Sequence, residues 1–538
     1  MVLFKTPVSV LQESVNKFPR RSVLKIPQQS SSGTTFKDIT YPVFAKDVEL
    51  SARYWKHQLS KLGVKDRAVV GVWLKGLAYL DVVNISGLQW AGYIPQLISL
   101  RMTNPSVVYE LLEKSEAVAL IHEPAFHSML QNSPLPIFPA EDVLSIDNLR
   151  ELPLPAVFEP SEAEDIMLIY HTSGSISGRP KLVPITAKWL DYIIGLSGTY
   201  EARNNLSGEY MTSVCIGSFC HMAASFLFWF SMREGSCVII PSSLPYPILE
   251  LRHMFEEHGL STASIFPPFL SAILRQARND PSLLASLQKA DTFGSGGLAL
   301  DPADEAWGRS QGLGMINVFA STELGLVMMS DLRKDTMYLE PMPGAKNEFV
   351  PLEDSPDSNE QLLELVILPD APNCPVPSLR SEDGKFYSGD LFVEMAPGQY
   401  LSKGRNDNWI KMETALRCDT ASLEANTMET CGDDLVSAVV VVGVGRPCPT
   451  IVIEPKDASV LGSGSKDTEE SVQKLKDDIF QRITPFHQRR YMHERIDDAR
   501  YILVVPQGTL PRTATKGNIR RQETEKVLKG KLDAIYAK

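Results

Sequence analysis

Apolar residues follow two patterns along the first 165 residues, one with the period of a helix and one of short continuous runs. The helical period covers residues 8–18, 45–62, 78–91 and 107–115, and the continuous runs cover 68–74 and 117–121. Strands that alternate with helices at this spacing predict βαβ units and a largely parallel sheet. A further apolar run at 165–170 and a helix-like segment at 187–196 continue the same order.

A second set of elements follows residue 400. Residues 435–443 and 448–454 read as apolar strands, 469–482 as a charged amphipathic helix and 522–537 as a final helix. A chain of 538 residues is too long for one hydrophobic core, because single cores stop growing beyond about 250–300 residues. The sequence therefore predicts an α/β protein of two or three domains.

Composition excludes several classes of protein. A formal net charge of −12 argues against nucleic acid as a partner, and no apolar run reaches the roughly 18 residues of a membrane span. Residues 1–27 contain scattered Lys and Arg without the apolar centre of a secretory signal. Seven cysteines without a C-x-x-C pair predict a reduced, cytoplasmic protein without structural zinc.

Small hydroxyl residues and glycines gather at 171–181, directly after the predicted strand 165–170. Glycines let backbone N–H groups approach an anion, while Ser, Thr and Lys add further donors. This composition predicts a loop that binds a triphosphate, although no Walker A spacing passes through it. A surface turn that is rich in Ser and Gly is the alternative reading.

The same stretch resembles the phosphate loop T-S-G-S-T-G-x-P-K of the adenylate-forming superfamily, which includes acyl-CoA synthetases, luciferases and adenylation domains of nonribosomal peptide synthetases. The resemblance implies that ATP phosphates contact Thr172, Ser173, Gly174, Ser175 and Lys181. Ile176-Ser177 stands where the family has a single Thr, so which hydroxyl contacts the phosphate stays open.

A second match is Asn317-Val-Phe-Ala-Ser-Thr-Glu323, which resembles N-x-Y-G-x-T-E. The resemblance implies that Asn317 faces the adenine edge and that Phe319 lies against its ring. It places Ser321 in the nucleotide site, Thr322 at the α-phosphate and Glu323 at a Mg²⁺ ion, which suits a carboxylate oxygen. A Glu that caps or solvates a helix start is the alternative.

Three further positions follow from resemblance alone. Phe386-Tyr-Ser-Gly-Asp390 resembles Y-x-T-G-D, which assigns the ribose hydroxyls to Asp390 after a Gly turn. Gly404-Arg-Asn-Asp-Asn-Trp-Ile-Lys411 resembles the domain junction G-R-x-D-x-x-I-K, with Arg405 on the nucleotide and Asp407 as the hinge. The implied domains are an adenylation core at 1–406 and a small α+β lid at 407–538.

The end of the chain contains the last motif. Leu510-Pro-Arg-Thr-Ala-Thr-Lys-Gly-Asn-Ile519 resembles L-P-x-T-x-S-G-K-I, whose Lys bridges the substrate carboxylate and the α-phosphate. We assign this catalytic role to Lys516, although Asn518 occupies the aligned position. A surface Lys is the alternative.

The acyl pocket is predicted from His221, Phe266 and a Gly-rich turn at 293–298 that includes Ser295, Gly296 and Gly297. His221 resembles the His of aryl- and fatty-acid-activating members, where it closes over the acyl group. Members that activate amino acids place an Asp in this segment, and this chain has no acidic residue between Tyr210 and Met232. An unpaired ammonium in the pocket would be costly, so the sequence argues against an α-amino acid.

The motifs together look most similar to adenylation domains of fungal carboxylic acid reductases. The implied reaction forms an acyl-AMP from ATP, Mg²⁺ and a carboxylic acid, and then transfers the acyl group to the phosphopantetheine of a carrier domain. NADPH is implied only if a reductase domain follows, and neither a carrier nor a reductase domain is seen here, as expected of an excised piece. A free-standing acyl- or aryl-CoA ligase and a catalytically silent adenylate-binding regulator remain alternatives, whereas a dehydrogenase is unsupported because no G-x-G-x-x-G follows a strand.

Overall fold

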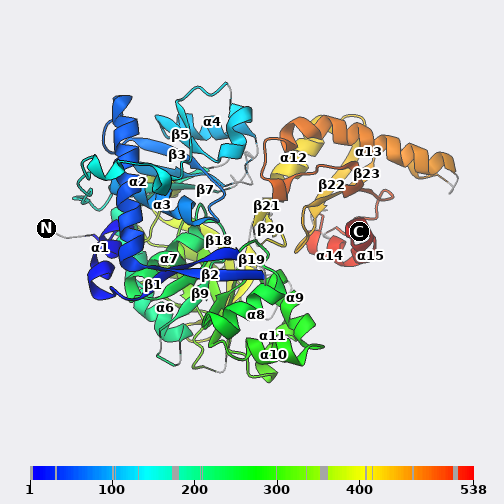
Figure 1. Ribbon diagram of the computed structural model, residues 1–538. Helices are drawn as coiled ribbons and strands as arrows, with labels where there is room; N and C mark the ends of the chain where they lie inside the picture. The colour runs from blue at the N-terminus through cyan, green and yellow to red at the C-terminus, as the bar shows by residue number, and fades with distance from the viewer. Residues whose placement is uncertain are drawn as a thin grey trace. The chain divides into compact units, whose positions relative to one another are not determined.

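The computed structural model describes most of the chain and divides it into two compact units (Figure 1). The described residues are 4–30, 33–99, 102, 104–130, 132–172, 181–205, 207–208, 210–297, 300–334, 336–351, 361–405, 409–414, 416–462, 466–512 and 519–537. The large unit comprises Met1–Leu100, Tyr109–His171 and Leu182–Asn406. The small unit comprises Arg101–Val108, Thr172–Lys181 and Asp407–Lys538.

The large unit is built on a nine-stranded sheet with the order β15-β14-β13-β12-β11-β9-β10-β1-β2. Its strands are β1 (Ser22–Ser30), β2 (Gly33–Thr40), β9 (Thr212–Val214), β10 (Cys237–Ile239), β11 (Thr262–Ser264), β12 (Thr292–Gly296), β13 (Met315–Ser321), β14 (Gly325–Met329) and β15 (Glu340–Pro341). The six central strands β13, β12, β11, β9, β10 and β1 pair in parallel. Strand β2 at one edge and strands β14 and β15 at the other pair antiparallel. The central strands therefore all end at one edge of the sheet.

A six-stranded sheet has the order β6-β5-β3-β4-β7-β8. Its strands are β3 (Val69–Trp73), β4 (Ile94–Leu97), β5 (Ala119–His122), β6 (Ile137–Pro139), β7 (Ile166–Thr172) and β8 (Lys181–Thr186). The pairs β3–β4, β3–β5, β4–β7 and β5–β6 are parallel, and all residues of β4 and β5 are buried. Burial on both faces explains why these strands are mostly apolar, and their two polar residues, Gln96 and His122, are themselves buried.

Helices cover both faces of the nine-stranded sheet. Side chains alternate along a strand, so Val238 and Ile240 join one core cluster and Ile239 joins the other. The first cluster joins both sheets to α1 (Pro7–Lys17), α2 (Tyr41–Lys61), α3 (Tyr79–Trp90), α5 (Ala187–Gly195), α6 (Ser197–Asn204) and α7 (Met222–Glu234). The second packs under α8 (Ile248–Glu257), α9 (Pro267–Ala277), α10 (Pro281–Leu287) and α11 (Pro302–Ser310), which group together in Figure 1. Helix α4 (Pro105–Lys114) follows β4.

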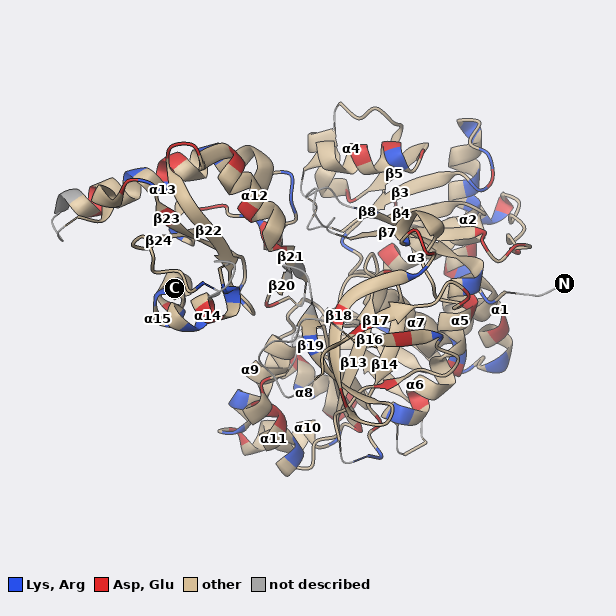
Figure 2. Ribbon diagram, turned by 180° about the vertical axis from the view of Figure 1, so that it is seen from behind, with Lys and Arg blue, Asp and Glu red and all other residues tan. Residues whose placement is uncertain are grey.

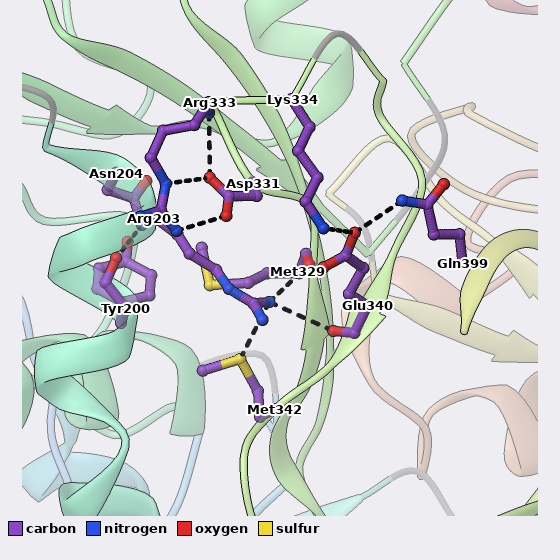
Figure 3. A network of polar contacts seen from close by, with 10 residues as sticks. All are labelled: Tyr200, Arg203, Asn204, Met329, Asp331, Arg333, Lys334, Glu340, Met342 and Gln399. Atoms are coloured by element: carbon purple, nitrogen blue, oxygen red, sulfur yellow. Dashed lines mark hydrogen bonds and ion pairs between the residues drawn. The ribbon is translucent and has the colours of Figure 1, made fainter. Parts of the chain in front are cut away.

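A third, antiparallel sheet completes the large unit. It comprises β16 (Asn347–Pro351), β17 (Leu363–Ile367), β18 (Phe386–Ala396) and β19 (Gln399–Arg405). A polar network links its Gln399 to the edge of the nine-stranded sheet (Figure 3). Gln399 Nε2 donates to Glu340 Oε1 at 2.9 Å, and Arg203 Nη1 on α6 donates to the Met329 carbonyl at 3.0 Å and the Glu340 carbonyl at 3.5 Å.

The small unit is an α+β fold, which confirms the predicted class of a large body of stacked sheets with a smaller α+β part. It contains the hairpin β20 (Trp409–Lys411) and β21 (Arg417–Asp419), a sheet of β22 (Val436–Val442), β23 (Thr450–Pro455) and β24 (Ile502–Val504), and helices α12 (Thr420–Cys431), α13 (Lys466–His487), α14 (Arg521–Val527) and α15 (Lys529–Tyr536). The single final helix predicted at 522–537 is wrong. The segment is divided at Leu528, which leaves helical geometry between α14 and α15 and is buried in a core cluster with Leu532.

Charged residues are distributed differently from apolar residues among the elements. The strands β13 and β14 contain no charged residue, and most of the blue and red segments of the ribbon in Figure 2 lie on helices and loops. All seven cysteines are free and buried. None of the helices in the described part of the chain combines the length and the apolar character that a bilayer crossing requires.

A buried tyrosine at the start of α2 provides a test of this packing. The Tyr41 hydroxyl donates to the carbonyls of Ser231 (3.0 Å) and Ser236 (2.9 Å), and the residue is fully buried. We predict that Tyr41→Phe lowers the free energy of unfolding by about 1–3 kcal/mol, because it removes a buried donor from two carbonyls, of which the Ser231 carbonyl still accepts the Ser236 N–H. Urea unfolding measures the change. Tyr387→Phe is the control, because Tyr387 is exposed and its hydroxyl donates to Asp383 Oδ2 at 2.9 Å near the surface; equal effects of the two substitutions would contradict the prediction.

Candidate functional site

The parallel register of the nine-stranded sheet brings the predicted pocket residues to one edge. Ser264 lies beside Gly294 in β11 and β12, and Ser295 lies beside Asn317 in β12 and β13. The segments that follow these strand ends contain Phe266, Gly297 and Thr322. His221 follows the end of the parallel strand β9 in the same sheet. Residues up to about 100 positions apart in the chain therefore leave the sheet on the same side, where ligands of open α/β sheets bind.

The Gly-rich turn predicted at 293–298 is wrong, because residues 292–296 form the central strand β12. Gly296 is needed for the sheet itself: a Cβ atom there would lie 2.7 Å from the Val318 carbonyl oxygen of β13. Ser295 is buried, and its Oγ lies 3.5 Å from the Ile316 carbonyl oxygen. Gly297, directly after the strand, has a φ of 86°, a left-handed conformation that favours glycine.

Asn317 is fixed by its backbone and keeps its side chain available. Its N–H donates to Ser330 Oγ at 2.8 Å, and its carbonyl accepts from the Ser330 N–H at 2.9 Å. Among the described residues, the side-chain amide has no hydrogen-bond partner. An amide that offers both a donor and an acceptor suits the edge of a purine base.

Phe319 is more enclosed than the resemblance suggests. The ring is 6% exposed, and its centroid lies 5.0 Å from that of Phe392 in an edge-to-face arrangement of 85°. Little of the ring surface is therefore left for a base. The same contact packs β13 against β18, which also contains Asp390.

The Ser321-Thr322-Glu323 turn rests on helix α5. Ser321 Oγ accepts the Leu324 N–H at 3.2 Å, and the Glu323 carbonyl accepts the indole N–H of Trp189 at 3.1 Å. Gly325 has a φ of 68°, and a Cβ atom there would lie 2.6 Å from Ile193 and 2.8 Å from the Trp189 ring. Because α5 directly follows β8, the segment after the predicted phosphate loop also positions this turn.

Thr322 and Glu323 are partly exposed at the tip of this turn. The Glu323 carboxylate has no hydrogen-bond or ion-pair partner in the described ranges. An uncommitted carboxylate at a strand end fits a hard divalent cation held jointly with phosphate oxygens.

Asp390 lies within strand β18 and not after a turn, so that part of the prediction is wrong. Its N–H donates to Ser388 Oγ at 3.0 Å, and the side chain is 2% exposed. Gly389 has a φ of 71°, and its N–H donates to Glu364 Oε1 at 3.0 Å. Asp390 pairs with Arg405 across β18 and β19, which places both predicted nucleotide contacts at one register position.

His221 is the N-cap residue of helix α7. Its Nδ1 accepts the Ala223 N–H at 3.3 Å, which places a proton of the neutral ring on Nε2. His171 at the end of β7 was assigned no role from the sequence. Its Nε2 accepts the Ser99 N–H at 3.3 Å, and burial lowers its pKa to about 4, with a smaller contribution from His221.

The remaining predicted residues are placed only in part. Thr172 ends β7, Lys181 begins β8 with an exposed side chain, and Phe266 is the half-buried residue before α9. Ser173, Gly174, Ser175, Asp407 and Lys516 lie outside the described residues, and Arg405 is described by its backbone alone. Trp189, which positions the Glu323 turn, was not found from the sequence because only a tertiary contact gives it this role.

The neutral state of His171 predicts a pH dependence of stability. The unfolded chain protonates this ring near pH 6.5 and the folded protein near pH 4, so protonation favours unfolding between these values. The contribution of the neutral His171 ring to the free energy of unfolding is therefore complete above about pH 6.5 and is lost as the pH falls toward about 4. We predict that His171→Gln makes the fall in unfolding free energy shallower by up to about 1.4 kcal/mol per pH unit.

Urea unfolding at several values between about pH 4.5 and about pH 7 measures this slope. His253→Gln is the control, because His253 lies at the surface of α8. Parallel curves for the wild type and His171→Gln would contradict the prediction.

Comparisons with known proteins identify the family of this chain. The AMP-binding enzyme family matches residues 11–348, and the AMP-binding enzyme C-terminal domain matches residues 407–538. The AMP-binding domain-containing enzyme iboA of Amanita muscaria (strain Koide BX008) is 31% identical over 525 residues, which cover 94% of this chain and 98% of that protein. Adenylate-forming reductase stbB of Stachybotrys bisbyi is 23% identical, covering 85% of this chain and 42% of its own length. The chain therefore spans nearly all of iboA but less than half of stbB.

Solved structures show the same fold. The o-succinylbenzoate CoA synthetase MenE of Bacillus subtilis superposes with a TM-score of 0.71 at 13% identity, over 96% of this chain and 98% of its own. The amide bond synthetase McbA of Marinactinospora thermotolerans also gives 0.71 at 13% identity, over 97% and 99% of the two chains. From the family match, the relative at 31% identity and the shared fold together, we conclude that the chain belongs to the AMP-binding, adenylate-forming enzymes, which use ATP to convert a carboxylate into an acyl-adenylate.

Proposed function

We propose that this enzyme activates an aryl or other apolar carboxylic acid that has no α-ammonium group, and that it passes the acyl group to a phosphopantetheine thiol of a carrier domain. The observation that carries the substrate class is the segment from β9 into α7. It presents His221 at the start of the helix and no acidic residue between Tyr210 and Met232. A substrate ammonium would have no counter-charge from this segment, and an unpaired buried charge is strongly unfavourable.

The described residues support distinct roles in the first half-reaction. The carboxylate oxygen of the acid attacks the α-phosphorus of ATP, and pyrophosphate leaves. Asn317 orients the adenine edge, and Asp390 and Arg405, which face each other across β18 and β19, orient the ribose and phosphates. Thr322 contacts the α-phosphate, and His221 lies against the acyl group. A Mg²⁺ ion held by Glu323 and phosphate oxygens would neutralise charge on the leaving pyrophosphate.

The phosphate loop and the hinge complete the proposal. Thr172, Ser173, Gly174, Ser175 and Lys181 hold the phosphates, and Lys516 neutralises charge as the acyl-phosphate bond forms. Residues 1–406 and 407–538 act as core and lid, and a change of backbone torsion at Asp407 follows adenylation. Coenzyme A is the alternative acceptor, because its reactive end is the same phosphopantetheine thiol.

The first prediction concerns the acid. ATP–pyrophosphate exchange with benzoic, cinnamic, fatty and α-amino acids should show exchange with members of the first three classes and none with α-amino acids. Glu323→Gln should lower kcat/KM about 10²–10³-fold, because it removes negative charge at the cation position. Glu348→Gln, on the exposed strand β16, is the control. Exchange with amino acids alone would contradict the substrate class, and no exchange with any acid would support the silent regulator.

The second prediction separates the half-reactions. Lys516→Ala should reduce ATP–pyrophosphate exchange more than about 100-fold and leave thioester formation from supplied acyl-AMP within about threefold of the wild type, because the lysine acts only while pyrophosphate leaves. Thioester formation is measured with a phosphopantetheinylated carrier domain and, separately, with coenzyme A. Lys526→Ala is the control, since Lys526 is an exposed residue of the same unit. Equal loss of both half-reactions would contradict the role of Lys516.

A further inference from the structure

The small unit contains a buried cluster of charged and polar side chains that the proposed chemistry does not use. The cluster consists of Asp419, His487, Arg490 and Glu494, none of which is more than 2% exposed. Arg490 Nη2 lies 3.2 Å from Glu494 Oε1. Arg490 follows the end of α13, and Glu494 ends the short helix η6 (Met492–Glu494). Burial on this scale is unusual for Arg and Glu, which are almost never fully buried unless paired.

The pairing in the cluster is incomplete. Among the described residues, Arg490 Nε, Nη1 and Nη2 make no hydrogen bond of good geometry, and neither do Asp419 Oδ2 and His487 Nε2. Buried ion pairs are frequently replaced by apolar residues without loss of stability, while unsatisfied buried groups are unfavourable. A contribution to stability therefore does not by itself explain why these residues are buried here. A need to hold the neighbouring backbone in one particular geometry would explain it.

That geometry concerns the end of strand β21. The Asp419 N–H donates to Glu494 Oε1 at 3.4 Å, and Asp419 Oδ1 accepts the Ser422 N–H at 3.1 Å, which begins α12. Glu494, itself beside Arg490, thus holds the junction between β21 and α12. In the hairpin, Asp419 pairs with Trp409.

Trp409 is the first residue of β20, two positions after Asp407. The opposite end of the hairpin is held by other contacts. The Glu413 N–H donates to the Arg446 carbonyl at 2.9 Å, and the Gly445 N–H donates to the Lys411 carbonyl at 2.8 Å. The cluster is therefore the polar anchor at the end of the hairpin that adjoins residue 407.

We propose that Arg490 and Glu494 are positioning residues that fix Asp419, and with it the Trp409 end of the β20–β21 hairpin, to the body of the small unit. The chain that leaves Asp407 then enters a rigid element, so that a torsion change there turns residues 409–537 together. Without this anchor, the hairpin would absorb the change. The inference rests on the proposed hinge and its role in the step that follows adenylation.

The test uses Glu494→Gln and Arg490→Met in the full chain, with the double variant to restore a neutral, filled core. The matched control is Arg482→Gln, because Arg482 forms an exposed ion pair with Asp434 in the same unit. Amide hydrogen exchange is followed separately in the β20–β21 hairpin and in strands β22 and β23. ATP–pyrophosphate exchange and thioester formation are measured on the same preparations.

In both single variants, we expect hairpin amides to exchange at least about tenfold faster, with β22 and β23 unchanged. In the single variants we expect pyrophosphate exchange within about threefold of the wild type and thioester formation reduced at least about tenfold. The double variant should recover the melting temperature that the single variants lose, but it should not recover acyl transfer. Unchanged hairpin exchange, or equal loss of both half-reactions, would overturn the inference. Amide exchange in the hairpin measures the effect of Arg490 and Glu494 without any substrate, so it tests the inference independently of the proposed function. A wild-type protein that forms no thioester with any acceptor would count against the proposed function instead.

Discussion

The parallel register of β9, β11, β12 and β13 is the constraint on which the candidate site depends. Parallel strands end at the same edge, so the segments after Val214, Ser264, Gly296 and Ser321 leave the sheet side by side. Gly296 allows β12 and β13 to lie close together, since any side chain there would meet the Val318 carbonyl. The chemistry assigned to these segments thus requires correct strand pairing before it requires any particular side chain.

Two contacts extend this arrangement beyond the sheet. The Trp189 indole bonds the Glu323 carbonyl, which ties the turn after β13 to the helix that follows the phosphate loop. The edge-to-face contact of Phe319 with Phe392 ties β13 to β18, where Asp390 lies. One hydrogen bond and one ring contact therefore connect α5, the segment 317–323 and β18 within the large unit.

Much of the fold could be predicted from the sequence, because helices and buried strands leave clear periodicities. Residues 45–62 and 78–91 are helices within a few positions, as α2 and α3 show. Glycine misled the prediction at 293–298, where it signals close strand approach and not a turn, and before Asp390, where it marks a left-handed position inside a strand.

The supporting contacts could not be predicted. Trp189 reads as an ordinary core residue of an apolar helix, and its bond to Glu323 joins residues 134 positions apart. No pattern in the sequence singled out Arg490 and Glu494, and the structure buries both. Local sequence patterns report periodicity and turn chemistry, whereas these roles arise from the tertiary packing of distant segments.

Photoaffinity labelling with an azido-adenine analogue of ATP tests the central claim most directly, because it reports which segments contact one bound nucleotide. If the strand ends of the large unit form a single site, peptides containing residues 315–323 and 386–405 should be labelled together, and excess ATP should suppress both with the same concentration dependence. Labelling of only one of these peptides, or suppression at clearly different ATP concentrations, would contradict the account.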